Sequence, residues 1–345
     1  MPQKIEIINP LNYPEWDSIL SSIKGVTFFH SQPWCNVLTK SYGYKPKYFV
    51  GFDNKDICAL VPFMEINTLF SPKRGISLPF SDYCPPVVSM EISFNEIFEA
   101  VSNYARRAGW NFVEFRGGSN HFNDIIPSSL CYEHKLFLNK DENKILNSFR
   151  SSTKRNIKKA LKEDIHVNID NSFDSLRKFY RLNCITRKNH GLPPQPFTFF
   201  KKVYDYVLSK KYGFIALAHY RDRVIAGAVY FHFGDKAIYK YGASEKQFQH
   251  MRANNLIMWE AIKWYAHREY SEFSFGKTNP EHHGLLQFKR GWGAQERSLY
   301  YYKYDFNNNR FIEDSVRNEK YYKILKKMPI ACLRMAGSLM YKHAG

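Results

Sequence analysis

The sequence predicts a mixed α/β (α+β) protein of two domains, each a small twisted mixed sheet flanked by helices. The chain has 345 residues, more than one hydrophobic core usually covers. Stretches with strand-like alternation and stretches with helical spacing intermix in both halves. Hydrophobic residues make up 44% and aromatic residues 17% of the chain, which excludes a disordered or collagen-like protein.

The first half predicts helices resting on a small sheet. Pro33 takes a favoured first-turn position of a helix, and Gly109 ends a later one. The turn at 53–56 joins two apolar strands into a hairpin, and the stretch 71–86, rich in Gly, Pro and Ser, is expected to be irregular. In chain order, the predicted elements are helices 13–23 and 30–42, strands 47–52 and 57–66, helix 96–108 and strand 111–116.

The second half contains more helix. A polar cluster at 138–141 precedes a long basic helix and marks the predicted domain boundary. We therefore predict a first domain at 1–138, a second at 139–308 and a basic helical tail at 309–345. In chain order, the predicted elements are helices 142–162, 173–188 and 196–208, strands 213–220, 224–233 and 236–241, helix 255–268, strand 272–275, helix 284–290 and strand 299–304.

The charge balance predicts an anionic partner. Lys and Arg number 50 against 32 Asp and Glu, a formal net charge of +18. Such a surface attracts nucleic acid, nucleotide-linked substrates or anionic lipids. The N-terminus lacks the apolar core of a signal peptide, and six scattered cysteines indicate neither a zinc site nor a disulfide framework. We therefore expect a cytoplasmic protein.

The C-terminal stretch 320–342 combines six cations with apolar residues and has no acidic residue. One interpretation is a foot on an anionic membrane surface. The other, which we favour because Pro329 interrupts the pattern, is a final helix that packs its apolar side on the protein.

A second basic stretch begins at Arg150. Helical spacing places Arg150, Lys154, Lys158 and Lys162 on one side, with Arg155 and Lys159 beside them, while Leu146, Phe149, Ile157, Ala160 and Leu161 are expected to pack. This face could contact a phosphate backbone or could simply be solvated, and the sequence leaves both open.

Two loops are candidates for a substrate site. The proline-rich segment 186–196 is stiff, so it either lines a cleft or spaces two helices. In segment 275–293, a strand ends in glycine and a short helix then delivers Lys289 and Arg290. A lysine there could neutralise the oxyanion that forms when an amine attacks an ester or thioester carbonyl. His282 and His283 are adjacent without a third ligand nearby, so no metal or other cofactor is predicted.

Motifs of other enzyme classes are absent from the sequence. It contains no G-x-S-x-G elbow, Walker loop, H-E-x-x-H motif or dinucleotide fingerprint. Hydrolase, kinase and dehydrogenase functions are therefore not predicted.

Several stretches together resemble the FemABX family, the aminoacyl-tRNA-dependent transferases of peptidoglycan bridge synthesis, and related acyltransferases of the GNAT superfamily. The matching stretches are HSQPWCNVLTKSYGYKPKYFVGF, SLPFSDYCPP, SSTKRNIKKALKEDI, TRKNHGLPPQPFTFF, AHYRDRVIAGAVYFHFGDKAIYKYGAS, NNLIMWEAIKWYAHREY and FSFGKTNPEHHGLLQFKRGWGAQ. The resemblance implies two tandem GNAT-like domains, a tail that packs on the first of them, and a charged tRNA as donor.

The resemblance also implies residue roles. Lys289 stands where the bridge enzymes have a lysine implicated in catalysis at the tRNA ester. Trp34, Tyr83, Arg116, Gln195 and Tyr241 would bind the acceptor, and Arg150, Lys154, Arg155, Lys158, Lys159, Arg252 and Arg290 would bind the donor RNA. Asn36, Gln195 and Arg116 depart from the residues that the family can have there, which leaves the acceptor open.

The donor loop favours tRNA over CoA. GNAT enzymes bind the CoA pyrophosphate through a glycine-containing loop, whereas segment 245–254 has no glycine. The sequence thus predicts an acyltransferase that moves an aminoacyl group from tRNA to an amine of a cell-envelope precursor. The alternatives are a CoA-dependent N-acyltransferase acting on an exopolysaccharide or nucleotide sugar, and a non-catalytic binder of nucleic acid or of an anionic membrane.

Overall fold

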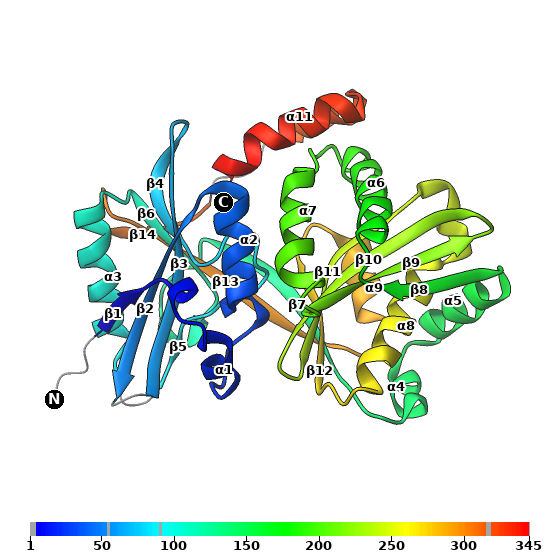
Figure 1. The fold of residues 1–345 in the computed structure, drawn as a ribbon, viewed down its shortest axis with the longest axis horizontal. Coiled ribbons are helices and arrows are strands. Elements are labelled where there is room, and N and C mark those ends of the chain that lie inside the picture. The colour runs from blue at the N-terminus through cyan, green and yellow to red at the C-terminus, as the bar shows by residue number, and fades with distance from the viewer. Residues whose placement is uncertain (1–4, 54–55, 90–91, 315–318, 345) are drawn as a thin grey trace. The chain divides into compact units, whose positions relative to one another are not determined.

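A computed structural model describes residues 5–53, 56–89, 92–314 and 319–344 (Figure 1). The chain forms two compact units, unit 1 with residues 1–131, 298–316 and 340–345, and unit 2 with residues 132–297 and 317–339. Strands β7 (Ser129–Phe137) and β13 (Gln295–Asp305) each run from one unit into the other. The borders therefore fall within these strands, whereas the sequence predicted them after 138 and 308.

Unit 1 is a mixed sheet with helices on both faces. Its strands follow the order β1-β2-β3-β4-β6-β13, with β5 paired to β3 and β14 paired to β13, and only β4 and β6 of these described strands run parallel. Its elements are β1 (Ile5–Ile8), α1 (Trp16–Ser21), α2 (Gln32–Tyr42), β2 (Lys45–Asp53), β3 (Asp56–Thr68), β4 (Ser71–Ile76), β5 (Val87–Val88), α3 (Phe94–Ala108), β6 (Phe112–Arg116) and β14 (Arg310–Ile312). Helix α3 lies on one face and α2 on the other (Figure 1).

The expectation of an irregular stretch from residue 71 was wrong for its first part, which is strand β4. Proline and glycine do not prevent this strand, because β4 pairs with β3 on one side and with β6 on the other. At Gly75 a side chain would collide with the ring of Trp110, which would lie 2.0 Å from its Cβ. Glycine is thus required by packing in the core, and the residue does not mark a loop.

Unit 2 is also a mixed sheet between helices. Its strands follow the order β7-β12-β11-β10-β9-β8, in which β11 and β12 run parallel. Its further elements are α4 (Glu142–Ser148), α5 (Ser151–Lys162), β8 (Ile165–Asp170), α6 (Phe173–Asn189), α7 (Phe197–Val203), which continues as a π-helical turn to Leu208, β9 (Gly213–Tyr220), β10 (Arg223–Phe233), β11 (Lys236–Ser244), α8 (Ala253–Ala266), β12 (Glu272–Thr278), α9 (His283–Arg290), α10 (Glu319–Lys327) and α11 (Ile330–Met340). Helices α6 and α7 cover one face, and α4, α5 and α8 lie on the other (Figure 1).

The predicted helix 142–162 is broken into α4 and α5. Phe149 is extended at ψ 147° and inserts its ring between Trp259 and Trp292, at centroid distances of 5.5 and 5.0 Å. The amide of Arg150 then donates to the carbonyl of Gly291 at 3.0 Å. The helical backbone is thus interrupted between Ser148 and Ser151, and the interruption allows the ring of Phe149 to pack in the core of unit 2.

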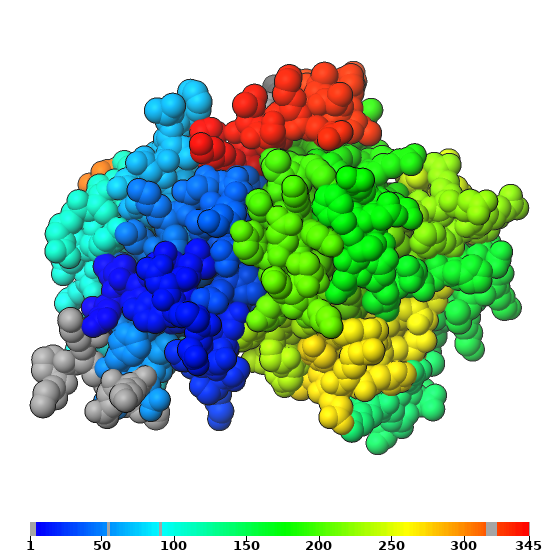
Figure 2. Space-filling view, viewed as in Figure 1, coloured from blue at the N-terminus to red at the C-terminus, as the bar shows by residue number. Residues whose placement is uncertain are grey.

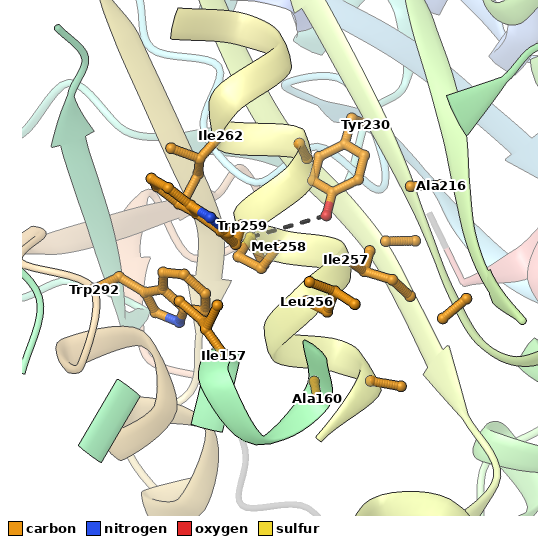
Figure 3. Close-up of a cluster of buried hydrophobic side chains, with 14 of the residues drawn as sticks. Ile157, Ala160, Ala216, Tyr230, Leu256, Ile257, Met258, Trp259, Ile262 and Trp292 are labelled. Atoms are coloured by element: carbon orange, nitrogen blue, oxygen red, sulfur yellow. Dashed lines mark hydrogen bonds between the residues drawn. The ribbon is translucent and has the colours of Figure 1, made fainter. Parts of the chain in front are cut away.

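Helix α5 packs as expected except at one position. Ile157 and Ala160 are buried against α8 (Figure 3), but Leu161, expected to pack, is 59% exposed. Thr153 is buried on the inner side beside Gly291, where a Cβ would meet its hydroxyl oxygen at 2.4 Å.

The basic tail divides between the units. Helix α10 and most of α11 belong to unit 2, whereas residues 309–316 and 340–345 belong to unit 1. In unit 1 the hydroxyl of Tyr44 donates to the carbonyls of Tyr341 and Lys342. The tail was expected to pack on the first domain, and its helices instead lie mainly in the second unit. None of the described helices combines the length and the apolar character needed to cross a bilayer.

Candidate active site

The parallel strands of unit 2 separate along their length. Their register begins at Lys236 and Glu272 and ends at Ile238 and Ser274, although β11 continues to Ser244 and β12 to Thr278. At the same level, β12 shifts its register against β7 between Ser274 and Lys277, and Gly276 adopts φ +68°. This left-handed residue within a bulge is a position that favours glycine.

The matching pair of unit 1 does not separate in this way. Beyond the last pair of β4 and β6, the amide of Ser77 donates to the carbonyl of Glu114 at 2.8 Å. The amide of Cys84 then donates to the carbonyl of Arg116 at 2.9 Å. In unit 1, backbone hydrogen bonds thus continue beyond the last pair of the parallel strands, whereas in unit 2 the pairing of β11 and β12 stops at Ile238 and Ser274. Unit 2 is therefore the better candidate for a reaction site.

Lys289 places its ammonium group at this separation. The residue is the second-last of α9 and only 2% exposed. Its Nζ donates to the carbonyl oxygens of Gly276 at 2.7 Å and of Lys277 at 3.3 Å. The sequence predicted that this lysine faces a crevice. The structure shows a buried ammonium that is hydrogen-bonded to Gly276 and Lys277, which follow the last β12 residue paired with β11.

A buried histidine next to this lysine was not identified from the sequence. His134 of β7 is 0% exposed, and its Nε2 lies 2.8 Å from a carboxylate oxygen of Glu296. Arg290 holds that carboxylate with two hydrogen bonds of 2.6 and 2.8 Å, which lowers its pKa. Burial lowers the pKa of His134, Glu296 opposes this shift, and the charge of Lys289 adds to it. The imidazole is therefore neutral at physiological pH.

The neutral state of His134 predicts acid sensitivity. Its folded pKa is below the ordinary 6.5, so as pH falls through 6.5 the unfolded chain takes up the proton first and stability decreases. We expect His134→Gln to lose less stability than the wild type between about pH 7.5 and 5.5, measured by urea unfolding. His166→Gln, at a histidine whose side chain is 80% exposed, is the matched control for the removal of a histidine. Equal pH dependence of all three proteins would contradict the prediction.

A second carboxylate lies beside His134 on β7. Glu133 is 4% exposed and accepts from the hydroxyl of Ser274 at 2.6 Å and from Nε of Arg297 at 2.5 Å. Two consecutive ionisable residues in the middle of a strand are a signal that the sequence offered, but that strand itself was not predicted. Glu133 ties β7 to β12 at the level of the bulge.

The predicted acceptor residues are divided between the units. In unit 1, Trp34 is 0% exposed and packs edge-on against Phe29 at 5.4 Å, which is the environment of a core residue. Tyr83 lies near Arg116, because the ring of Tyr83 packs on Gly117, the next residue in the chain. The Nε of Arg116 donates to the carboxylate of Glu114 at 2.8 Å.

In unit 2, Gln195 and Tyr241 flank a group of aromatic rings. The hydroxyl of Tyr180 donates to the carbonyl of Gln195 at 3.1 Å, and the rings of Phe200 and Tyr241 are 5.3 Å apart. Gln195 is buried, and its Nε2 has no hydrogen-bond partner among the described residues. The same holds for the hydroxyl of Thr278 at the end of β12, which the sequence analysis missed. Buried polar groups without a protein partner are candidates for contact with a ligand or an ordered water.

The predicted donor residues lie mainly on one exposed helix face. Arg150, Arg155, Lys158, Lys159 and Lys162 are exposed, and none makes an ion pair with a carboxylate in the described part of the chain. The ammonium of Lys154 instead donates to the carbonyl of Asn147 at 3.3 Å. Arg252 is exposed at the start of α8, and Arg290 is bound to Glu296. Arg252 has a left-handed backbone at φ +63°.

The stiff loop after α6 lies near the start of α9. The pKa of His190 is lowered by burial and then by the charges of Arg187, His282 and Lys326. The two loops that the sequence marked as substrate candidates are therefore neighbours in unit 2. Among the described residues, no group of His, Cys, Asp and Glu is arranged to hold a metal ion, including His282 and His283.

Two comparisons with known sequences match parts of this chain. A family described as an acetyltransferase (GNAT) domain matches residues 147–290, from the end of α4 to the last residue of α9. A stretch of 76 residues is 32% identical to the lipid II:glycine glycyltransferase of Staphylococcus epidermidis. That stretch covers 20% of this chain and 18% of the relative, so the chain matches less than a fifth of that protein's length.

Solved structures share the fold at low sequence identity. The crystal structure of FemX superposes with a TM-score of 0.68 at 14% identity, covering 94% of this chain and 100% of the other. A tandem GNAT protein from the clavulanic acid biosynthesis pathway superposes with a TM-score of 0.58 at 6% identity, covering 88% of this chain and 98% of the other. These matches confirm the resemblance inferred from the sequence, and residues 147–290 match an acetyltransferase (GNAT) domain.

Proposed function

We propose that this protein is an acyltransferase that moves an aminoacyl group from tRNA to an amine of a cell-envelope precursor at the cytoplasmic side of the membrane. The observation that carries the proposal is the buried ammonium of Lys289, fixed where β11 and β12 of the GNAT-type segment separate. The similarity to a lipid II:glycine glycyltransferase supports the envelope acceptor.

The proposed reaction needs one localised positive charge. The acceptor amine attacks the ester carbonyl of the aminoacyl-tRNA, a C–N bond forms and the C–O bond to the ribose breaks. The amine proton passes, directly or through water, to the ribose oxygen that leaves. The ammonium of Lys289 would stabilise the oxyanion of the tetrahedral intermediate, and its two backbone acceptors would keep it oriented.

The exposed cations of α5 would hold the RNA. Phosphate contacts release counterions, so binding that depends on these residues must weaken with salt. We expect Lys158→Glu/Lys159→Glu to weaken tRNA binding about 10- to 100-fold at moderate salt and to reduce the salt slope by about two. Fluorescence anisotropy at several salt concentrations measures both quantities.

A matched control separates this site from the general charge of the protein. Lys201→Glu/Lys210→Glu changes the net charge by the same amount at two exposed lysines outside α5. If both double variants weaken tRNA binding equally, α5 is not the RNA site.

A CoA-dependent N-acyltransferase is the second candidate, because the matching family is described as an acetyltransferase domain. The segment that follows β11 argues against it. This segment begins with the buried carboxylate of Glu245, which accepts from Arg223 at 2.6 Å, and continues as a 3-10 helix over Lys246–Met251 without glycine. A pyrophosphate there would meet a carboxylate and side chains instead of open backbone amides.

Two measurements test the proposal. Calorimetry with charged tRNA and with acyl-CoA compares the donors, and micromolar binding of acyl-CoA without binding of tRNA would reject the tRNA donor. Mass spectrometry of envelope precursors and surface glycans, from cells with and without the protein, then identifies the acceptor. A mass increase of one aminoacyl group on an envelope precursor is the expected result, and unchanged precursors with a modified glycan would favour the alternative.

A further inference from the structure

Helix α11 is fixed to unit 2 along one side. Leu333 is 0% exposed, and the guanidinium of Arg334 lies 5.6 Å from the ring centre of Tyr180. Gly337, one turn after Leu333, packs so closely that a Cβ would come within 2.0 Å of the carbonyl oxygen of Pro194. The helix is thus held in one rotation about its axis.

The opposite side of the helix exposes large apolar side chains. Met335 and Leu339 lie two residues after Leu333 and Gly337, about 200° around the helix, and are 65% and 66% exposed. Ile324 of α10 is 65% exposed as well. Figure 2 shows the red α11 at the surface of the molecule. Single exposed apolar residues are ordinary, but two of them one turn apart form a stripe.

The same segment carries exposed cations on α10, on α11 and directly after α11, without carboxylates to balance them. Lys323, Lys326, Lys327, Arg334 and Lys342 are exposed, and none makes an ion pair with a carboxylate in the described ranges. The sequence from residue 320 to the last residue contains no Asp or Glu. A helix with an apolar stripe and flanking lysines is typical of proteins that lie on anionic membrane surfaces.

We infer that the outward side of α10 and α11 docks on the surface of an anionic lipid bilayer. Met335 and Leu339 enter the boundary between headgroups and acyl chains, while the lysines contact the acidic headgroups. Charge decides between a bilayer and a second copy of this chain. A symmetric dimer through this face would bring two sets of unbalanced cations together, whereas an anionic bilayer neutralises them.

Unit 1 has an exposed apolar feature of its own, which contacts the residues that follow α11. Leu69 and Phe70 form the tip of the β3–β4 hairpin and are 95% and 83% exposed. The ring of Phe70 lies 5.3 Å from the ring of His343, and Arg74 donates to the carbonyl of His343 at 2.7 Å. The residues that follow α11 are therefore fixed beside another pair of exposed apolar side chains.

Vesicle sedimentation with the full-length protein tests the inference. The wild type should bind vesicles of phosphatidylcholine that contain about a third phosphatidylglycerol and should bind pure phosphatidylcholine at least about tenfold more weakly. Met335→Ser/Leu339→Ser should lower binding to the anionic vesicles about tenfold or more. The control Leu161→Ser, at an apolar residue of α5 that is 59% exposed, should bind like the wild type.

Charge variants complete the test. Lys326→Glu/Lys327→Glu should abolish the preference for anionic vesicles, whereas Lys201→Glu/Lys210→Glu should largely keep it. Binding that Met335→Ser/Leu339→Ser leaves unchanged, or that both charge variants weaken equally, overturns the inference. It is also overturned if the protein is a dimer by light scattering and Met335→Ser/Leu339→Ser makes it monomeric.

The insertion of α11 into the bilayer can also be measured directly, without depending on a loss of binding that misfolding could cause. A fluorophore on Met335→Cys should increase in emission with anionic vesicles, whereas the same label on Leu161→Cys should not. Equal responses at both positions overturn the inference. None of these experiments uses an acyl donor or acceptor, so their failure leaves the proposed transfer reaction untouched.

Discussion

Lys289→Met should lower the rate of acyl transfer by about 10²- to 10³-fold, the effect typical of removing one preorganised donor to an oxyanion. Methionine keeps an unbranched side chain, one heavy atom shorter, and removes the charge. Because Lys289 is buried and its ammonium is held by the carbonyls of Gly276 and Lys277, the charge has a fixed position. Single-turnover transfer from charged tRNA measures the rate, and tRNA binding should stay within about twofold.

The control for this experiment must account for stability. Without the ammonium, the carbonyls of Gly276 and Lys277 lose a donor, at a cost of about 1–3 kcal/mol. Lys135→Met is the matched control, because Lys135 is a half-buried lysine of unit 2 that donates to Glu272 at 2.6 Å. It should lose stability without losing rate per folded molecule. A Lys289→Met protein that turns over at the wild-type rate would remove Lys289 from the mechanism.

Trp292→Ala should have the largest effect on the stability of unit 2, about 3–5 kcal/mol. Trp292 (Figure 3) is 0% exposed. Its ring contacts the rings of Phe149, Phe275 and Phe288 at centroid distances of 5.0, 6.1 and 5.8 Å. These rings belong to the break before α5, to β12 and to α9. The cavity left by alanine would therefore loosen the elements that position Lys289.

Calorimetry of unfolding measures this loss. Trp264→Ala is the control, because Trp264 belongs to the same unit and is partly exposed under the guanidinium of Arg268, 4.0 Å from the ring centre. We expect that control to cost less than half as much. Equal losses for the two variants would show that the aromatic cluster around Trp292 is not a main support of unit 2.

Much of the secondary structure could be predicted from local pattern. The hairpin of β2 and β3, the capped helix α3 and the strands β9, β10 and β11 were predicted near their observed bounds. Strand β8 was missed, although Ile165, Val167 and Ile169 alternate as a half-buried strand does. The break at Phe149 could not be predicted, because its cause is a contact with Trp259 and Trp292, which are far away in the sequence.

The candidate site was predictable only in part. The motif before Trp292 identified Lys289, and helical spacing identified the cations of α5. No local pattern joins His134 to Glu296, or Glu133 to Ser274, since these pairs are far apart along the chain and meet through strand pairing. The surroundings of the predicted acceptor residues also differ in a way that the sequence does not show. Trp34 packs in the core of unit 1, whereas the buried side-chain Nε2 of Gln195 has no hydrogen-bond partner among the described residues.

The sequence by itself determined the fold class, the tandem organisation, the excess of positive charge and the lysine of the candidate site. These features depend on composition, on periodicity and on short motifs, which are local. Only the tertiary structure decided where the tail helices lie, which carbonyls hold Lys289 and that His134 is buried beside Glu296. The physical reason is that burial and charge pairing depend on which strands become neighbours, and neighbours in a sheet are set by packing across the whole unit.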